Sequence, residues 1–254
     1  MSDRLHCIEA GHLALPTVVL LHGFGAVASC WREVITAIEG NTHVLAYDLP
    51  GHGGSLNYPN AGSGKVAAQA VIAELDFRAL SKVHLVGHSM GGAIACSVAL
   101  ARPDLAASLT LLSPGGFGPE LNVPLLQDYA AARTPSELLA ALSPMAAVNA
   151  FISLQNVRDL VAMRAAAGQR DLLEFIVSRM ARDGKQGVLP LAELAALHIP
   201  TALLWGEADI IVPVSQCGAA PMKFNKEILP DVGHMLIEEV PEAVAALILK
   251  SSHI

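Results

Sequence analysis

Residues 86–93, VGHSMGGA, place a serine between glycines at the end of an apolar run. Gly87, Ser89 and Gly91 fit the pattern G-x-S-x-G, in which a sharp strand-to-helix turn exposes a serine hydroxyl as a nucleophile. The pattern alone is weak, because glycine and serine are common in turns. Its setting strengthens it, since the apolar run VHLVG precedes the serine and the helical pattern GAIACSVALARP follows it. Ser89 is therefore predicted to be a nucleophile, and the alternative is an ordinary polar residue in a turn.

A serine hydroxyl needs a base that removes its proton, and that base needs a carboxylate that orients it. Asp209 follows the apolar run at 201–206, and His234 follows the run at 225–229. Both lie just after predicted strands, in the chain order Ser, Asp, His that serine hydrolases on parallel sheets use. The sequence predicts a triad of Ser89, His234 and Asp209, although separately Asp209 could be a turn residue and His234 a solvated one.

Other residues nearby could compete for these roles. The rival acids are Glu207, Glu238 and Glu239. Asp209 is preferred by its position directly before the segment IIVP. His88 is a rival base, but a residue adjacent to a nucleophile usually points away from the proton that it would have to take. An acid after the run SLTLLS is excluded because PGGFGP contains none.

Acyl transfer also requires donors for an oxyanion. The segment HGFG at 22–25 can supply the backbone N–H of Phe24, and Met90, the residue after the serine, can supply a second one. His22 is expected to hold this loop. The candidate substrate contacts are His22, Gly23, His88, Leu125, Phe151 and Leu154.

Six short apolar runs are predicted to be the strands that position these loops. They are TVVLLHG (17–23), HVLAYD (43–48), VHLVG (83–87), SLTLLS (108–113), TALLWG (201–206) and NKEIL (225–229). Runs that are apolar throughout suit strands buried on both faces, and helical patterns between them imply parallel neighbours. The predicted fold class is α/β, a doubly wound and mostly parallel sheet. Ligands in such sheets bind beyond the carboxyl ends of the strands.

Between the fourth and fifth runs the pattern becomes helical. Thr134, Pro135 and Glu137 form a capping-box signal, and Asn156 with Asp159 is a weaker one. Residues 170–184 carry apolar side chains on one helical face, with Gly184 as a plausible end of that helix. We therefore expect one domain, 1–254, with a core of 1–118 and 196–254 and an all-helical lid over approximately 119–195.

Composition excludes several classes of function. The chain has 254 residues, of which 53% are hydrophobic and 15% charged, and its formal net charge is -7. No dense block of Lys and Arg could neutralise a row of phosphates, so no nucleic-acid partner is expected. No apolar stretch near the start is long enough to cross a bilayer or resembles a signal peptide, which predicts a cytoplasmic protein without a membrane partner. The four cysteines lack a C-x-x-C pair, and no metal-binding spacing of histidines is present, so neither a metal nor a cofactor is expected.

The motifs LLHGFG, DLPGHGGS, LVGHSMGGA, GEADIIVP and GHM occur in this order, and across nearly the whole chain they resemble the α/β-hydrolase superfamily. Residues 84–122 are similar to the hydrolase-like domain of the acetoin dehydrogenase dihydrolipoamide acetyltransferase component. They also resemble the meta-cleavage product hydrolases, which break carbon–carbon bonds in ring-fission products of aromatic compounds. The second resemblance implies a cation in the lid for carboxylate-bearing substrates, and the candidates are Arg133, Arg158 and Arg164. Haloalkane dehalogenases and epoxide hydrolases of the superfamily carry aspartate at the nucleophile position, so Ser89 argues against both activities.

Together these features predict a serine hydrolase that forms an acyl-enzyme with a small or medium ester, thioester or related acyl compound. A carbon–carbon bond hydrolase of the meta-cleavage type is the first alternative. A ligand sensor with slow turnover on a hydrolase scaffold is an alternative of another class. The expected partner is a small-molecule acyl substrate, and the sequence does not indicate the oligomeric state.

Overall fold

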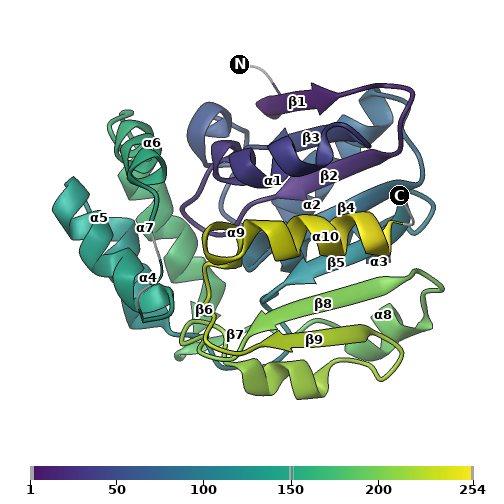
Figure 1. Cartoon of the computed structure of the whole chain (residues 1–254). Helices are drawn as coiled ribbons and strands as arrows, with labels where there is room; N and C mark the ends of the chain where they lie inside the picture. The colour runs from purple at the N-terminus through teal and green to yellow at the C-terminus, as the bar shows by residue number, and fades with distance from the viewer. Residues whose placement is uncertain (1–2, 149, 151, 253–254) are drawn as a thin grey trace.

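The computed structural model describes residues 3–148, 150 and 152–252, and within them a central sheet has seven strands in the order β1-β3-β2-β4-β5-β8-β9 (Figure 1). These strands are β1 (Cys7–Gly11), β2 (Thr17–Leu21), β3 (His43–Tyr47), β4 (Val83–His88), β5 (Ala106–Leu112), β8 (Thr201–Gly206) and β9 (Asn225–Leu229). β1 is antiparallel to β3, whereas every other neighbouring pair in this sheet is parallel. The predicted α/β class is thus confirmed.

All six predicted strands are present, and β1 is an additional one. β3 and β8 are buried along their whole length, as expected for apolar runs with helices on both faces. β1 has the sequence CIEAG, and its residues are half-buried or exposed because it lies at the edge of the sheet. A short, partly polar edge strand has no continuous apolar run, so the sequence pattern did not indicate it.

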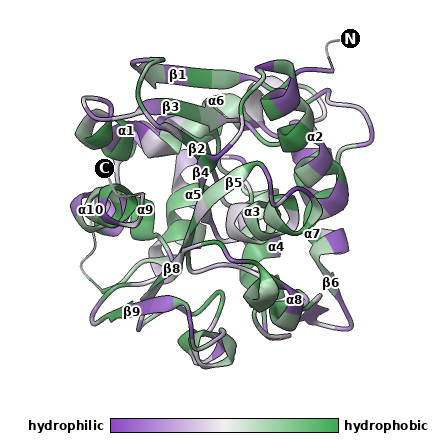
Figure 2. Ribbon diagram, turned by 90° about the vertical axis from the view of Figure 1, so that its right-hand side faces the viewer, coloured by the Kyte–Doolittle hydropathy of each residue, from purple (hydrophilic) through white to green (hydrophobic). Residues whose placement is uncertain are grey.

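Helices cover both faces of the sheet (Figure 1). The helices of the core are α1 (Arg32–Ile38), α2 (Gly64–Phe77), α3 (Met90–Ala101), α8 (Leu191–Ala196), α9 (Leu236–Glu239) and α10 (Pro241–Ser251). Successive side chains of a strand point to opposite faces. Val19 and Leu21 therefore pack in one cluster with α2 and α3, while Val18 and Leu20 pack in another with α1 and α10. Figure 2 shows hydrophilic residues on the outer sides of α2 and α10 and on the edge strand β9.

Four further helices lie together beyond one end of the sheet (Figure 1). They are α4 (Val123–Ala131), α5 (Pro135–Leu142), α6 (Leu154–Arg164) and α7 (Gln169–Met180), and we call them the helical segment. A hairpin of two-residue strands, β6 (Ala181–Arg182) and β7 (Lys185–Gln186), connects α7 to the core. The region 119–195 is therefore not all-helical. Short 3-10 turns complete the chain, at η1 (Ala28–Trp31), η2 (Gly53–Ser55), η3 (Ser143–Met145) and η4 (Val214–Ala219).

The ends of these helices test the predicted caps. The capping box of Thr134 and Glu137 at the start of α5 is confirmed. At α6 the cap is Ser153, whose hydroxyl accepts a hydrogen bond from the N–H of Asn156, so Asn156 is the third helical residue and not the cap. α7 ends at Met180, and Gly184 instead occupies the turn of the β6–β7 hairpin with a φ of 73°. A left-handed glycine suits either a helix end or a tight hairpin, which is why the pattern was ambiguous.

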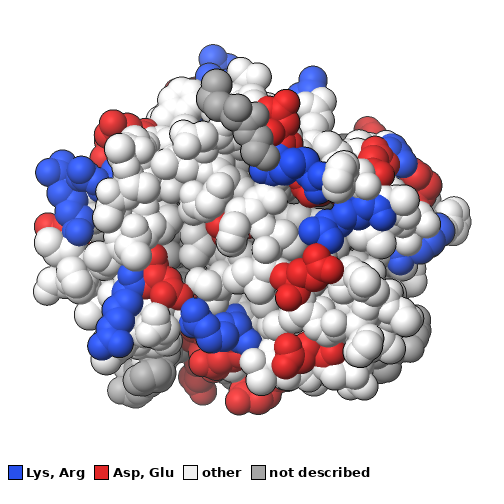
Figure 3. All heavy atoms as spheres, turned by 90° about the horizontal axis from the view of Figure 1, so that it is seen from above, with Lys and Arg blue, Asp and Glu red and all other residues white. Residues whose placement is uncertain are grey.

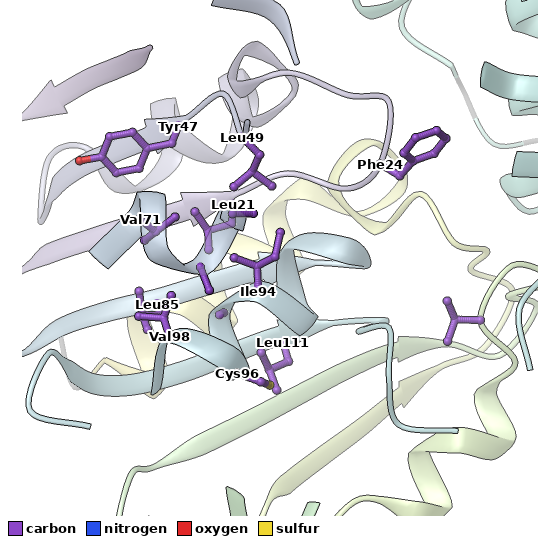
Figure 4. Close-up of a cluster of buried hydrophobic side chains, with 14 of the residues drawn as sticks. Leu21, Phe24, Tyr47, Leu49, Val71, Leu85, Ile94, Cys96, Val98 and Leu111 are labelled. Atoms are coloured by element: carbon purple, nitrogen blue, oxygen red, sulfur yellow. The ribbon is translucent and has the colours of Figure 1, made fainter. Parts of the chain in front are cut away.

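The largest hydrophobic cluster joins the sheet to the helical segment. Figure 4 shows Leu21, Leu85 and Leu111 gathered with side chains of α2 and α3, whereas Phe24 is set apart from them. The same cluster includes Leu126 of α4 and Leu173 of α7, so the helical segment shares one hydrophobic core with the sheet. In the part of the chain that is described, every helix is too short or too polar to span a bilayer.

Candidate active site

Ser89 occupies the turn between β4 and α3 in a backbone conformation that side chains rarely adopt, with φ 51° and ψ −116°. Such strain is characteristic of functional turns. Glycine is required on both sides, because a Cβ on Gly87 would lie 2.3 Å from the carbonyl oxygen of Gly91, and one on Gly91 would lie 2.2 Å from that of Leu21. The close approach of α3 to β2 and β4 therefore produces the turn, and Ser89 is at its apex.

Asp209 and His234 meet beside this turn. The Nδ1 atom of His234 lies 2.8 Å from Oδ2 of Asp209, and both side chains are almost completely buried. The other oxygen, Oδ1, accepts hydrogen bonds from the N–H groups of Ile211 and Val212 at 2.8 and 2.9 Å. Burial by itself would raise the pKa of Asp209, but the charge and hydrogen bond of the His234 ring and these two amides lower it overall. Asp209 is thus an ionised acceptor that fixes the ring.

The orientation of the His234 ring leaves its Nε2 atom facing away from Asp209. Since a carboxylate only accepts hydrogen bonds, Nδ1 carries a proton in this contact, and Nε2 is the atom that offers a lone pair to a general-base step when the ring is uncharged. No hydrogen bond between the Ser89 hydroxyl and this ring is present among the described residues. Catalytic hydrogen bonds often form fully only when substrate is bound.

His88 is bonded to the backbone of His234. Its Nε2 donates a hydrogen bond of 2.7 Å to the backbone oxygen of His234, and the two ring centroids are 4.8 Å apart. Burial, followed by the neighbouring charge of His234, lowers the pKa of His88 to about 3, so this ring is neutral. The Nδ1 atom faces Gly23, where a Cβ would lie only 2.9 Å away.

Glu239 fixes the same loop from the other side. Its carboxylate accepts hydrogen bonds from the N–H groups of Gly233 and Met235, which flank His234, at 2.9 and 3.0 Å. It also accepts one from Ala147, which follows η3, at 2.9 Å. The N–H of His234 in turn donates to the backbone oxygen of Met145 at 2.7 Å. The histidine loop is therefore attached directly to the chain between α5 and α6.

The loop after β2 is fixed through His22. Its Nδ1 is 2.8 Å from the oxygen of Gly23, and its Nε2 accepts a hydrogen bond of 2.9 Å from the N–H of Leu49. Burial lowers the pKa of His22, and a neutral ring with one donor and one acceptor matches both contacts. A Cβ on Gly23 would also lie 3.4 Å from that of Ser89. The backbone bearing Phe24 therefore passes directly over the serine.

Gly25, the next residue of this loop, is bound to the helical segment. Its backbone oxygen accepts hydrogen bonds from the Tyr129 hydroxyl at 3.0 Å and from Nη1 of Arg164 at 3.3 Å. The guanidinium of Arg164 is buried, with its central carbon 4.5 Å from the centroid of the Tyr129 ring. The N–H of Gly25 donates to Nε2 of His52 at 3.1 Å. Arg164 thus positions a backbone loop in this structure.

A cavity of about 410 Å³ contains Ser89 and Met90 in its wall. Met90 is the first residue of α3, where the N–H groups have no partner inside the helix. Side chains of both the core and the helical segment complete the wall, with Leu49, Pro50, His52, Ile94, Leu121, Ile176, Met180, Leu189 and Val212 among them. The loop at 48–55 contributes Leu49, Pro50 and His52 to this lining. The volume is within the usual range for small-molecule sites.

Several expected substrate contacts lie elsewhere. Leu125 is half-buried against the hydrophobic core, and Leu154 is 58% exposed at the start of α6. Neither belongs to the described residues that line the cavity, and the same holds for His22, Gly23 and His88. For Leu125 and Leu154 the pattern identified apolar helix faces but not the side to which they point. Phe151 lies outside the described residues, so the prediction for it stays open.

Three residues that support the site, Asp48, Glu239 and Arg164, have roles that the sequence analysis does not predict. Asp48 directly follows β3, as Asp209 follows its strand, and its carboxylate accepts hydrogen bonds from the N–H groups of Ala28 and Gly54 at 2.7 and 2.8 Å. For Glu239 the sequence indicates only a rival acid of the triad, and the structure instead shows it bonded to the backbone around His234. No sequence spacing indicates the Arg164 contact, because it joins segments that are 139 residues apart. Within the described ranges, no group of three or more His, Cys, Asp or Glu side chains is arranged to hold a metal ion.

Comparison with known proteins agrees with this architecture. The model of the alpha/beta hydrolase family matches residues 18–247. The chain belongs to the alpha/beta hydrolase family. The resemblance inferred from the motifs is confirmed, and hydrolases are among the relatives of this family member.

Two bacterial relatives of this alpha/beta hydrolase are similar at 32% identity. One is the dihydrolipoyllysine-residue acetyltransferase component of the acetoin cleaving system of Pseudomonas putida, over 240 residues that are 94% of this chain and 64% of that protein. The chain thus spans less than two thirds of the length of that relative. The other is the 2-hydroxy-6-oxononadienedioate/2-hydroxy-6-oxononatrienedioate hydrolase of Cupriavidus pinatubonensis, over 98% of this chain and 84% of that protein.

A solved structure shares the fold. The 2-hydroxy-6-oxo-6-phenylhexa-2,4-dienoate hydrolase of Rhodococcus sp. strain RHA1 superposes with a TM-score of 0.84 at 23% identity. The superposition covers 98% of this chain and 95% of that one. At this identity the likeness concerns the fold alone.

Proposed function

We propose that the protein is a serine hydrolase that cleaves a small or medium ester, thioester or related acyl substrate through an acyl-enzyme. The observation that carries this proposal is the 2.8 Å contact between His234 Nδ1 and Asp209 Oδ2 beside the strained Ser89 turn. An imidazole that a buried carboxylate holds at Nδ1 beside a nucleophile turn is the arrangement that activates a serine. The cavity then receives the acyl compound.

The proposed reaction has two stages. The Nε2 atom of His234 takes the Ser89 proton while the serine oxygen attacks the carbonyl carbon, and the N–H groups of Phe24 and Met90 stabilise the oxyanion. His234 then gives its proton to the departing alcohol or thiol, which leaves an acyl-enzyme. In the second stage His234 removes a proton from water, and the acid is released with Ser89 restored. No residue in this sequence requires a cofactor or a metal.

We further propose that the helical segment acts as a lid, within approximately 119–195, over a core of 1–118 and 196–254. Support comes from Ile176 and Met180 of α7, which line the same cavity as Ser89. The contacts of Gly25 with Tyr129 and Arg164 connect this lid to the oxyanion loop. Movement of the lid would therefore reach the site through the loop after β2, to which Tyr129 and Arg164 are directly bonded.

The proposed partner is a small molecule rather than a nucleic acid or a membrane. On the face shown in Figure 3, Lys and Arg side chains alternate with Asp and Glu and form no continuous basic strip. A cytoplasmic location remains part of the proposal.

A carbon–carbon bond hydrolase is the second candidate. It is favoured by the 32% identity to the Cupriavidus pinatubonensis enzyme, which acts on a 2-hydroxy-6-oxo dienedioate according to its name. Both candidates use the same triad, so substrate panels rather than triad mutants separate them.

The test is turnover of a p-nitrophenyl ester series with acyl chains of two to ten carbons, beside a vinylogous 2-hydroxy-6-oxo dienoate. We expect measurable ester hydrolysis that Ser89→Ala abolishes. Turnover of the dienoate alone would mean that the protein is a carbon–carbon bond hydrolase and would contradict ester hydrolysis. Turnover of neither compound, with a folded protein, would contradict both candidates and favour a ligand sensor.

A further inference from the structure

Two cationic side chains belong to residues that line the cavity at Ser89. Among its lining residues are Lys65, at the start of α2, and Arg179, near the end of α7. The described residues that line this cavity include no Asp or Glu. This composition is unexpected in a chain with 23 acidic and 16 basic residues and a net charge of -7.

Neither of these two cations has an acidic partner. Arg32, Arg78 and Arg102 are also surface arginines, and each lies 2.7 to 2.8 Å from a carboxylate oxygen. By contrast, no salt bridge within 4.0 Å involves Lys65 or Arg179 anywhere in the described part of the chain. Both side chains belong to exposed residues, so a ligand can reach them from the cavity.

The backbone near Lys65 adds to the positive potential. Ser63 caps α2, a helix of 14 residues, and Ser63, Gly64 and Lys65 all line the cavity. The N-terminus of a helix carries a partial positive charge that favours anions. The positive end of α2 and the two cationic side chains therefore all favour an anion in the cavity.

Much of the rest of the wall is apolar, although His52, Ser97 and Gln186 also belong to it. Ala93 and Ile94 of α3 line the cavity together with Ile176 and Met180 of α7 and with Leu189. A flexible hydrocarbon chain suits such a wall. The cavity thus combines a nucleophile, an apolar wall and an unpaired pair of cations in one space.

From these observations we propose that the substrate is an acyl compound with a carboxylate at the end remote from the scissile carbonyl. Lys65 and Arg179 bind that carboxylate, and the apolar wall holds the chain between it and Ser89. This inference rests on the proposed acyl hydrolysis and specifies its substrate class. A guanidinium binds a carboxylate through two parallel hydrogen bonds, whereas an ammonium contributes as a point charge.

The test compares p-nitrophenyl monoesters of dicarboxylic acids with p-nitrophenyl esters of monocarboxylic acids that have the same number of chain atoms. The measured quantity is the ratio of kcat/KM between the two esters in each pair. We expect the wild-type protein to prefer the carboxylate-terminated ester at one or more chain lengths. Raising NaCl from 20 mM to 500 mM should weaken this preference, because salt screens exposed charges.

Substitutions assign the preference to the two cations. Lys65→Met and Arg179→Met should each lower the ratio by roughly 2- to 5-fold, the range for exposed ion pairs, and the double variant by roughly 10-fold. Lys65→Arg and Arg179→Lys keep the charge and should retain most of the preference. The matched controls are Lys250→Met and Lys82→Met, which remove exposed cations that do not line the cavity and should leave the ratio unchanged.

Each remaining outcome has a definite meaning. Efficient hydrolysis of neutral esters without any preference for the carboxylate would overturn this inference and leave the proposed function intact. An unchanged ratio in the double variant would also overturn it, since the preference would then arise elsewhere. Lack of turnover of both esters would contradict the proposed function itself, and this inference with it.

Discussion

At the scale of single residues, the site depends on how many contacts fix His234. Its ring is held by Asp209, its backbone oxygen by His88 and its backbone N–H by Met145. A positioned base contributes far more to rate than a mobile one, because misplacement of a reacting group by about 1 Å can cost about 100-fold. Several hydrogen bonds with buried groups therefore fix the position of this one imidazole.

Asp209→Asn tests the role of the carboxylate. The Asn oxygen can still accept the hydrogen bonds of Ile211 and Val212, but its NH₂ group faces Nδ1 of His234 and favours the wrong tautomer. We expect kcat for an ester substrate to fall by roughly 1,000- to 10,000-fold. Thermal unfolding should show a Tm within a few degrees of the wild-type value. A variant that retains more than a tenth of wild-type kcat would show that another acid orients the base.

At the scale of elements, loops from distant parts of the chain are bonded to one another at the carboxyl ends of the strands. Glu239, which ends α9, binds both the loop of His234 and Ala147, which lies between α5 and α6. Arg164 of α6 similarly binds the loop after β2. Both halves of the site are therefore bonded to the helices of this segment or to the chain that connects them.

Glu239→Gln tests this link. Glutamine has one acceptor oxygen, so its NH₂ group would face at least one of the three N–H donors that the carboxylate now accepts. We expect kcat to fall about 10-fold, with KM less affected, and the free energy of unfolding to fall by about 1–3 kcal/mol. Steady-state kinetics and urea titration measure both quantities.

Glu238→Gln is the matched control for that variant. Burial raises the pKa of Glu238 to about 8, so its carboxyl is mostly uncharged at pH 7, and its contact is with Asn156 Nδ2 at 3.4 Å. Glutamine has nearly the same shape and charge, and both quantities should stay near their wild-type values. Equal losses in the two variants would contradict a specific role for Glu239.

The elements also show what sequence reasoning can and cannot reach. Apolar runs located the six parallel strands and, with them, the loops that carry Ser89, Asp209 and His234, because residues after parallel strands must share one edge. The capping box of Thr134 and Glu137 located the start of α5, because a helix cap is formed by residues that are close in the sequence. The edge strand β1 was not predicted, because its sequence is short and partly polar. The contacts of Glu239 with Ala147 and of Arg164 with Gly25 could not be predicted, because they depend on tertiary packing between residues far apart in the sequence.

At the scale of the whole molecule, burial of neutral histidines connects stability to pH. His52 and His88 are both buried, and burial is the main cause that lowers the pKa of each to about 3. In the unfolded chain a histidine has a pKa of about 6.5. Between these values the unfolded state binds more protons than the folded one, so stability falls as the pH decreases from about 6.5 toward 3.

His88→Asn isolates one part of this dependence. Asparagine does not titrate, so the variant should lose less unfolding free energy than the wild type between pH 7 and pH 5, by about 1–2 kcal/mol. Urea unfolding at both pH values gives the two differences. Glu238 titrates in the opposite sense but is the same in both proteins, so its contribution cancels. Identical pH dependence in the two proteins would mean that His88 is not kept neutral by burial.

The activation of Ser89 is the central claim, and intact-mass spectrometry after exposure to a fluorophosphonate tests it most directly. This reagent forms a covalent adduct only with a serine that a neighbouring base activates. The account predicts one adduct on the wild-type protein, none on Ser89→Ala and much slower labelling of His234→Ala. Absence of an adduct on the folded wild-type protein, under conditions that label a control serine hydrolase, would contradict the account and reduce the G-x-S-x-G motif to a structural turn.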